Sequence, residues 1–211
     1  MRNSYKYKLA AVISAMLLLS LGVVAIVTGA LFARMLSGSV SLDSGTWLPR
    51  ARALAEFHLQ DMSGREFDLN NLRGHPTLLF FGFTNCPDVC PTTLSTLEQV
   101  QRQAPLAGAQ VVFVSVDPER DSDASLQAYL GAFDKNFVGV RGERTALAPL
   151  LRSLNAIAVR QDLPGGGYTM DHSATLYLLD TQGRLVAVFS PPFSSTKLTA
   201  DLHQIGAARR L

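Results

Sequence analysis

The chain has 211 residues, 47% of them hydrophobic, and its formal net charge at pH 7 is +2. Three of the positive charges, on Arg2, Lys6 and Lys8, lie in the first eight residues and no acidic residue precedes Asp43, so the rest of the chain is close to neutral. This charge balance gives nucleic-acid binding no support, because such binding needs a basic surface on the folded domain.

An apolar run without a charged residue extends from Leu9 to Ala33. About 20 such residues are enough to cross a bilayer, whereas the apolar core of a cleavable signal peptide usually has about 7–15 residues. The run therefore predicts a transmembrane anchor over residues 9–33. A weak small-residue cleavage site at Thr28 and Ala30 leaves removal of the segment open.

The charges on either side of this run predict its orientation. Three basic residues lie in residues 1–8, whereas only Arg34 follows the run nearby. Basic residues favour the cytoplasmic side of a span. We therefore expect a cytoplasmic tail over 1–8 and a single-pass protein of the inner (cytoplasmic) membrane, with its C-terminal part on the periplasmic or extracytoplasmic side. Residues 34–53, rich in Ser and Gly, are expected to be a tether, and residues 54–211 one domain.

The expected domain begins with a short β-hairpin, Ala55–Leu59 and Glu66–Leu69, around the turn Asp61–Gly64. The unbroken apolar run Leu78–Phe81 then fits a strand buried on both faces, and Gln110–Val116 fits a second one.

The remaining segments predict alternating helices and strands. Helices are expected over Pro91–Gln103, from a cap at Ser122 or Asp123 to Phe133, over Thr145–Leu154 and from Ser194 or Ser195 onwards, and strands over Phe137–Val140, Ala156–Arg160, Ala174–Leu179 and Leu185–Phe189. This order predicts an α/β sandwich. A mixed sheet with a dithiol after its first long strand is the thioredoxin-like arrangement, to which the leading hairpin is an addition.

Cys86 and Cys90 are the only cysteines, and they follow the first buried strand. A separation of four places both sulfurs on one face if the segment is helical, and a helix N-terminus there favours the thiolate. Outside the cytoplasm two cysteines form a structural disulfide by default. A bridge across so short a loop would constrain the unfolded chain little. A reactive dithiol, a soft metal site and an inert disulfide all remain open.

Among the four histidines, His172 is the candidate for a third metal ligand. It precedes a predicted buried strand whose entrance can lie beside the cysteine turn, and histidine is a common metal ligand. His58, His75 and His203 are expected to be exposed or structural.

Acidic and sulfur-containing residues near the strand ends have less specific expected roles. Asp117 and Asp171 are at strand ends, where functional side chains gather, but for Asp117 we expect a role in bracing a loop. Glu119–Asp121 is expected to be a solvated charge cluster, and Met170 a packing residue.

Three motifs together resemble the Sco/SenC family: F-F-G-F-T-N-C-P-D-V-C-P from Phe80, V-S-V-D-P-E-R-D from Val114 and M-D-H-S-A-T-L-Y-L-L-D from Met170. Members of this family are membrane-tethered, thioredoxin-like copper proteins that help to assemble cytochrome c oxidase. The resemblance extends from about Leu54 to the last helix and includes the N-terminal anchor.

The resemblance implies that Cys86, Cys90 and His172 bind copper as Cu(I), Cu(II) or both. It also implies cytochrome c oxidase subunit II as the client, with other exported copper chaperones or thiol reductants as further partners. Many members have a histidine where this chain has Asn85, which is a poor copper ligand. Any fourth Cu(II) ligand must therefore come from elsewhere. Asp117 matches a family aspartate with a structural or docking role.

Two functions follow from this resemblance, in addition to the inert disulfide. The first is a copper chaperone for the binuclear site of subunit II. The second, an enzymatic one, is a thiol–disulfide reductase that keeps the cysteines of that subunit reduced. His172 favours the first, because thiol exchange needs no third soft ligand.

Overall fold

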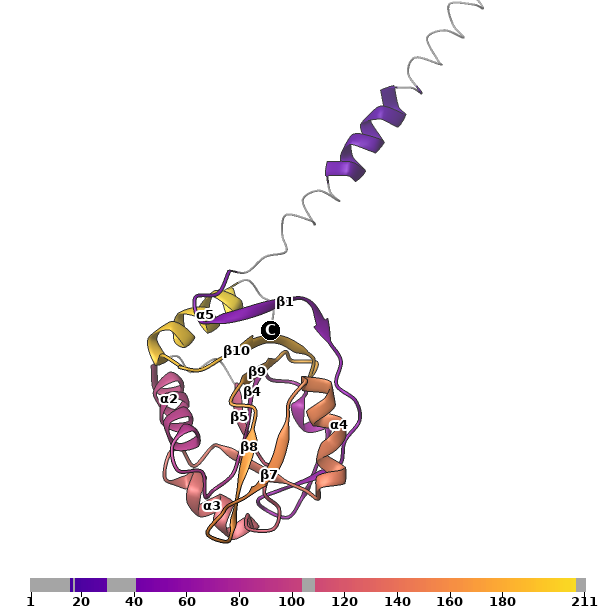
Figure 1. Cartoon of the computed structure of the whole chain (residues 1–211). Coiled ribbons are helices and arrows are strands. Elements are labelled where there is room, and N and C mark those ends of the chain that lie inside the picture. The colour runs from indigo at the N-terminus through magenta and orange to yellow at the C-terminus, as the bar shows by residue number, and fades with distance from the viewer. Residues whose placement is uncertain (1–15, 17, 30–40, 104–108, 208–211) are drawn as a thin grey trace, which may run out of the picture. The chain divides into compact units, whose positions relative to one another are not determined.

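The computed structural model describes residues 16, 18–29, 41–103 and 109–207 (Figure 1). The chain divides into two compact units, Met1–Ser39 and Val40–Leu211, and each is described by itself.

In the first unit, residues 18–29 are helical and their side chains are exposed. The predicted cytoplasmic tail, residues 1–8, lies outside the described residues, as do residues 9–15, 17 and 30–33 of the predicted span. Within the described ranges, no helix is both long enough and apolar enough to cross a membrane.

The second unit is built on a mixed eight-stranded sheet with the order β1-β10-β9-β4-β5-β6-β2-β3. Its strands are β1 (Gly45–Arg52), β2 (Leu59–Asp61), β3 (Glu66–Phe67), β4 (Thr77–Gly82), β5 (Gln110–Ser115), β6 (Val138–Arg141), β9 (Leu176–Leu179) and β10 (Leu185–Phe189). The central strand β4 is buried at every position and pairs parallel with β5 and antiparallel with β9. The apolar run that starts at Leu78 therefore forms the centre of the sheet, as predicted.

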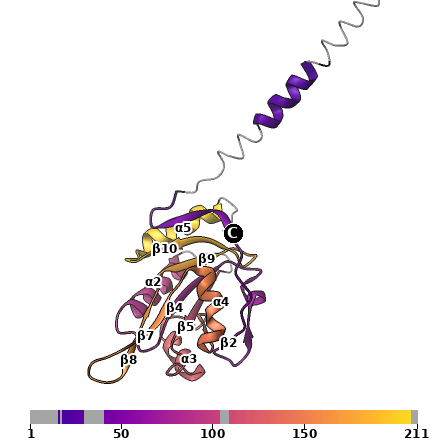
Figure 2. The ribbon, with the colours of Figure 1, turned by 45° about the vertical axis from the view of Figure 1, so that its right-hand side comes forward.

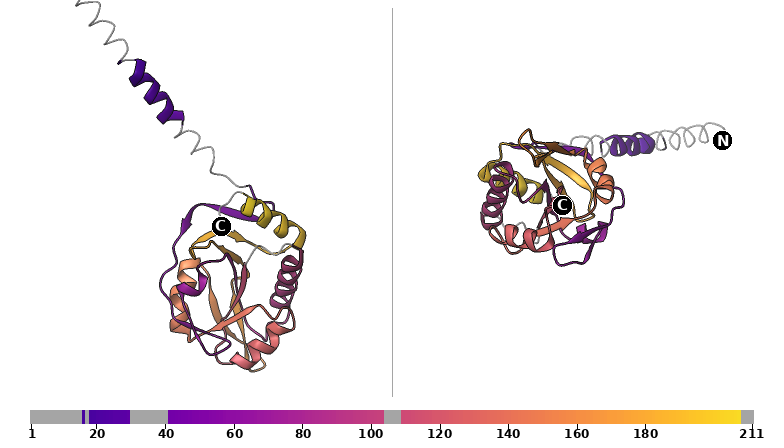
Figure 3. Two further views of the ribbon diagram at one scale, coloured as in Figure 1. Left: turned by 180° about the vertical axis from the view of Figure 1, so that it is seen from behind. Right: turned by 60° about the horizontal axis from the view of Figure 1, so that its bottom comes forward.

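Helices cover the two faces of this sheet. They are the 3-10 helix η1 (Leu69–Leu72) and the α-helices α2 (Val89–Gln103), α3 (Asp123–Gly131), α4 (Arg144–Leu154) and α5 (Ser195–Ala207). Helices α2 and α5 lie together on one face, and α4 lies on the other (Figures 1 and 3). The second unit is thus a thioredoxin-like α/β sandwich, as the order of elements predicts.

Strands β7 (Ala158–Asp162) and β8 (Tyr168–His172) form a separate antiparallel hairpin, which extends beyond the main sheet in Figure 2. The sequence predicts β7 but not β8, because exposed and partly buried residues alternate irregularly along β8. His172 is therefore the last residue of β8 and lies four positions before β9, not directly at the start of a buried strand.

The structure corrects the predicted tether over residues 34–53, because β1 occupies Gly45–Arg52 and pairs antiparallel with β10. Residues 43 and 44, just before β1, are also attached to the fold, and residues 34–40 of the predicted tether lie outside the described residues. The buried carboxylate of Asp201 on α5 accepts hydrogen bonds from the backbone N–H groups of Asp43 (2.7 Å) and Ser44 (2.9 Å). The sequence does not reveal this strand, because the segment before it is rich in Ser and Gly and most residues of β1 are exposed.

The expected leading hairpin corresponds to β2 and β3, which pair antiparallel with Leu59 opposite Phe67. The first strand begins at Leu59 and not at Ala55, and β2 also pairs with β6. These two short strands lie at one edge of the eight-stranded sheet.

Candidate metal centre

Cys86 and Cys90 lie at the connection between β4 and α2. The Cys86 backbone N–H donates to the Phe83 carbonyl (3.1 Å), which closes a turn, and the Cys90 N–H donates to Cys86 Sγ (3.4 Å). Cys90 is fully buried, whereas Cys86 remains 8% exposed, and both are free thiols. The turn therefore brings the two sulfurs together with only Cys86 reaching the surface.

Gly82, the last residue of β4, makes room for the buried sulfur. A Cβ atom at this position would lie 3.0 Å from Cys90 Sγ and 2.6 Å from the ring of Phe113. A side chain larger than hydrogen would displace the thiol or the ring, so the motif needs glycine here.

His172 reaches the same place from the end of β8. Its Nε2 lies 3.5 Å from Cys90 Sγ, and its Nδ1 lies 3.2 Å from the Ser173 carbonyl oxygen. A carbonyl can only accept, so this contact assigns the proton to Nδ1 and leaves the Nε2 lone pair directed toward the sulfur. The rings of Phe80 and Phe83 contact the imidazole edge-on, with centroids at 6.1 and 5.7 Å. These contacts fix the orientation of the ring.

The donor atoms of Cys86, Cys90 and His172 all lie within 4.8 Å of one another. A pair of thiolates with one imidazole is a set of soft and intermediate donors, which suits copper or zinc better than magnesium or calcium. The set opens into a surface pocket lined by Phe83, Cys86, Pro87, Asp88, Val89, Thr169, Met170, Asp171 and His172. The structure thus brings the predicted ligands together where an ion can enter.

The two cysteines differ in their acidity. The pKa of Cys86 is lowered to about 4, chiefly by the hydrogen bond with the Cys90 side chain, with a further contribution from the Cys90 backbone N–H. The pKa of Cys90 is raised by the same hydrogen bond and by burial. Cys86 is therefore the thiolate at neutral pH, and Cys90 keeps its proton.

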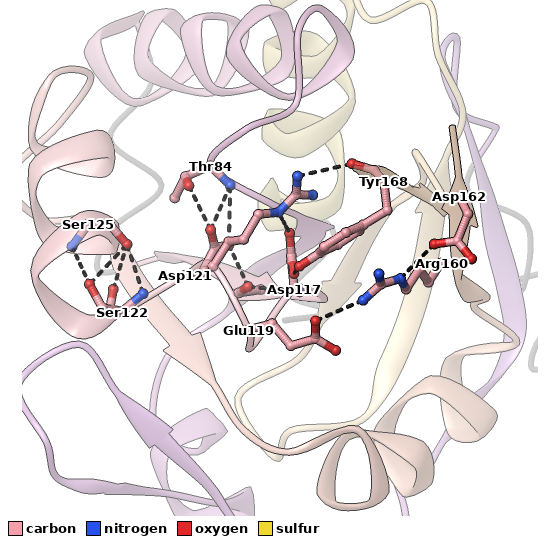
Figure 4. A network of polar contacts seen from close by, with 11 residues as sticks. Thr84, Asp117, Glu119, Asp121, Ser122, Ser125, Arg160, Asp162 and Tyr168 are labelled. Carbon is pink, nitrogen blue, oxygen red and sulfur yellow. Dashed lines mark hydrogen bonds and ion pairs between the residues drawn. The ribbon is translucent and has the colours of Figure 1, made fainter. Parts of the chain in front are cut away.

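Asp121 anchors the loop that leads to the cysteines. Its buried carboxylate accepts hydrogen bonds from the Thr84 backbone N–H (3.1 Å), the Thr84 hydroxyl (2.6 Å) and the Ser115 hydroxyl (2.6 Å), as Figure 4 shows in part. The prediction that Glu119–Asp121 is a solvated cluster is therefore wrong for Asp121, because its partners lie on β5 and the cysteine loop.

Asp117 braces the loop after β5, which confirms its predicted role. The carboxylate is buried and accepts from the Arg120 guanidinium and from the Tyr168 hydroxyl (2.8 Å). Arg120 also donates to the Tyr168 carbonyl (3.0 Å), so it too is part of the structure around the site and not a solvated charge. Tyr168 is not recognisable from the sequence, because its partners are about fifty residues away along the chain.

The other residues considered from the sequence remain outside the three-donor set. Met170 is buried and packs in the core, as expected, and Asp171 is an exposed residue of the pocket wall. Asn85 and His203 are exposed, and His75 is half-buried.

His58, Glu66 and Asp68 form a second group of neighbouring donors, on the exposed β2–β3 edge. His58 Nδ1 lies 2.8 Å from Glu66 Oε1, and this hydrogen bond raises the pKa of His58. The carboxylate of Asp68 caps η1. His58 and Glu66 thus bind each other and Asp68 binds the backbone, as expected for a structural role of His58.

Comparison with known proteins places this geometry in a family. Residues 47–207 match the family model described as SCO1/SenC. The mitochondrial SCO2 homolog of Bos taurus is 35% identical over 161 residues, which cover 74% of this chain and 60% of that protein.

Solved structures agree with this match. Copper-bound ScoI of Bradyrhizobium japonicum is 37% identical, with a TM-score of 0.64, over 72% of this chain and 98% of that chain. Copper-bound yeast Sco1 is 29% identical, with a TM-score of 0.67, over 76% of this chain and 90% of that one. Because the family match covers most of the chain and includes all three donor residues, this protein belongs to the SCO1/SenC family.

Proposed function

We propose that this protein is a copper chaperone that binds copper through Cys86, Cys90 and His172. The observation that carries the proposal is the convergence of the three donor atoms within 4.8 Å at the mouth of a surface pocket. Thiolates select Cu(I), and imidazole is accepted by both Cu(I) and Cu(II). The donor set therefore fits copper in either oxidation state, and related structures carry copper.

The proposed client is subunit II of cytochrome c oxidase, whose binuclear site would receive the copper. Membership of the SCO1/SenC family supports this proposal. So does the exposure of Cys86 at the pocket, because a client thiol can approach the copper there while Cys90 and His172 still hold it. Other exported copper chaperones and thiol reductants are proposed to load and reduce the site.

We also propose that the protein is a single-pass protein of the inner membrane, with residues 40–211 on the extracytoplasmic side. The uncharged run from Leu9 to Ala33 and the excess of basic residues before it support this placement.

Thiol–disulfide reduction is a second candidate function, which the different acidities of the cysteines favour. The Cys86 thiolate would attack a client disulfide, forming a mixed disulfide and releasing one client thiolate. Cys90 would then displace the second client thiol, leaving a Cys86–Cys90 disulfide and a reduced client. Low pKa and exposure at Cys86, with burial at Cys90, suit these two roles.

The first prediction concerns metal stoichiometry. The reduced protein should bind one Cu(I), and Cys86→Ser or Cys90→Ser should weaken binding on the order of 100-fold or more, because loss of a ligand should exceed the 10–100-fold typical of lost outer-shell partners. Competition with a chromogenic Cu(I) chelator measures the affinity. His203→Ala, at an exposed residue outside the site, is the control. Parental affinity in the double serine variant would refute the assignment.

The second prediction separates the two candidate functions with His172→Ala. Two thiolates can still hold Cu(I), so Cu(I) binding should weaken without vanishing, whereas Cu(II) prefers nitrogen ligands and should lose its complex. The rate of reduction of a model disulfide should change little, because it depends on the thiolate and its access. Cu(II) absorption, electron spin resonance and the exchange rate test this. An unchanged Cu(II) spectrum would remove His172 from the ligand set.

The third prediction concerns the client. Cu(I)-loaded protein mixed with the reduced, metal-free binuclear domain of subunit II should transfer its copper, measured in the two proteins after their separation. Transfer should be faster than from a copper–glutathione complex at equal concentration, because the exposed side of the site lets the client thiols bind before release. Transfer no faster than from glutathione would argue against delivery to this client.

The fourth prediction concerns topology. A reporter fused after Leu211 should be active only outside the cytoplasm, because the basic tail holds the N-terminus inside. The same reporter fused after Lys8 should be active only inside. Cytoplasmic activity of the first fusion would contradict the proposed location.

A further inference from the structure

The third donor, His172, lies on the β7–β8 hairpin, which is not hydrogen-bonded to the strands of the main sheet. Among the described strands, β7 and β8 pair only with each other. Ladder hydrogen bonds therefore cannot fix the distance from His172 to the cysteines at the end of β4. The short link from His172 to β9 limits this distance, and side-chain contacts between the hairpin and the body of the domain set it.

Such a contact is present at the other end of β8, where Tyr168 lies between two arginines. The guanidinium carbon of Arg120 is 3.9 Å from the centroid of the Tyr168 ring, and that of Arg160 is 3.7 Å away. Both approach within the range of a cation–π interaction. Arg120 belongs to the loop after β5 and Arg160 to β7, so the ring is clamped between the domain body and the hairpin.

Hydrogen bonds and ion pairs close this clamp (Figure 4). The Tyr168 hydroxyl donates to buried Asp117 (2.8 Å), and Arg120 donates to the Tyr168 carbonyl (3.0 Å). On the outer side, Arg160 pairs with Glu119 (2.8 Å). The loop from Asp117 to Arg120 therefore holds both the side chain and the backbone of the first residue of β8.

The clamp is connected to the metal centre by two routes. Tyr168, Met170 and His172 share one face of β8, because alternate residues of a strand point the same way. In addition, the Arg120 guanidinium lies 5.6 Å from the centroid of the Phe83 ring, which itself contacts the imidazole of His172 edge-on. Tyr168 is therefore connected to His172 both along the strand and through the packing of Arg120 on Phe83.

We propose that Tyr168, clamped between Arg120 and Arg160, is a positioning residue that holds His172 beside Cys86 and Cys90. This inference rests on the proposed copper function and adds to it. With the clamp closed, copper meets three donors. With the clamp open, the hairpin carries the imidazole away and leaves a two-thiolate site, which holds Cu(I) but is poor for Cu(II).

The test is Tyr168→Leu in the full chain, with Tyr168→Phe as the conservative variant. Leucine removes the clamped ring, so Cu(II) affinity should fall about 10–100-fold, the usual cost of losing the support of a ligand, and Cu(I) affinity should change much less. Phenylalanine keeps the ring between the arginines and should retain most of the Cu(II) affinity and the parental spin-resonance spectrum.

A second readout needs no copper. In the metal-free protein, Tyr168→Leu should accelerate amide hydrogen exchange in β7 and β8 and leave exchange in β4 and β5 unchanged. Arg65→Gln, which removes an ion pair with Asp61 at the β2–β3 edge of the sheet, is the control and should alter neither the hairpin nor the Cu(II) signal.

Three results would overturn the proposal. The first is a folded Tyr168→Leu protein with the parental Cu(II) spectrum and parental amide exchange in β8. The second is an equal loss of Cu(II) affinity in the phenylalanine and leucine variants. The third is a loss of Cu(I) affinity as large as the loss of Cu(II) affinity in Tyr168→Leu. Failure of the copper function itself is distinguishable, because the parent protein would then bind no copper while the exchange experiment still reports on the clamp.

Discussion

The approach of His172 Nε2 to Cys90 Sγ, at 3.5 Å, is the contact on which the functional site depends. It joins positions 82 residues apart in the chain. One side is fixed by the buried strand β4 and the turn after it, where Gly82 leaves space for the sulfur. The other side is held by the β7–β8 hairpin, by the rings of Phe80 and Phe83 and by the short link to β9, and no ladder hydrogen bond joins the hairpin to the main sheet.

This difference in support suits a protein that must both bind and release a metal ion. The cysteines belong to the hydrophobic core: Cys90 is fully buried, and Cys86, the thiolate, is 8% exposed. The imidazole comes from a hairpin attached by side-chain contacts around Tyr168. Under the proposed clamp, opening at Tyr168 would change the coordination of the metal from three donors to two, and the same dithiol remains available for disulfide exchange.

The parts of the fold with strong local patterns were predictable from the sequence. The apolar run around Phe80 and the helical spacing of Leu94 and Leu97 gave β4 and α2 close to their true bounds. Strands β1 and β8 were not predictable, because most of their residues are exposed. The position of His172 in the sequence made it a candidate metal ligand. Only the resemblance to the Sco/SenC family identified it as a copper ligand. The contacts of Arg120 with Tyr168 and of Asp121 with Thr84 are long-range, and no local pattern reveals them.

X-ray absorption at the copper edge of the Cu(I)-loaded reduced protein tests the central claim most directly, because it counts the donor atoms around the metal. With Cys86, Cys90 and His172 as ligands, the first shell must contain two sulfurs and one nitrogen, and the nitrogen must show the outer-shell scattering of an imidazole ring. A first shell with sulfur alone would exclude His172. A shell of nitrogen and oxygen alone would place the copper outside this site and contradict the account.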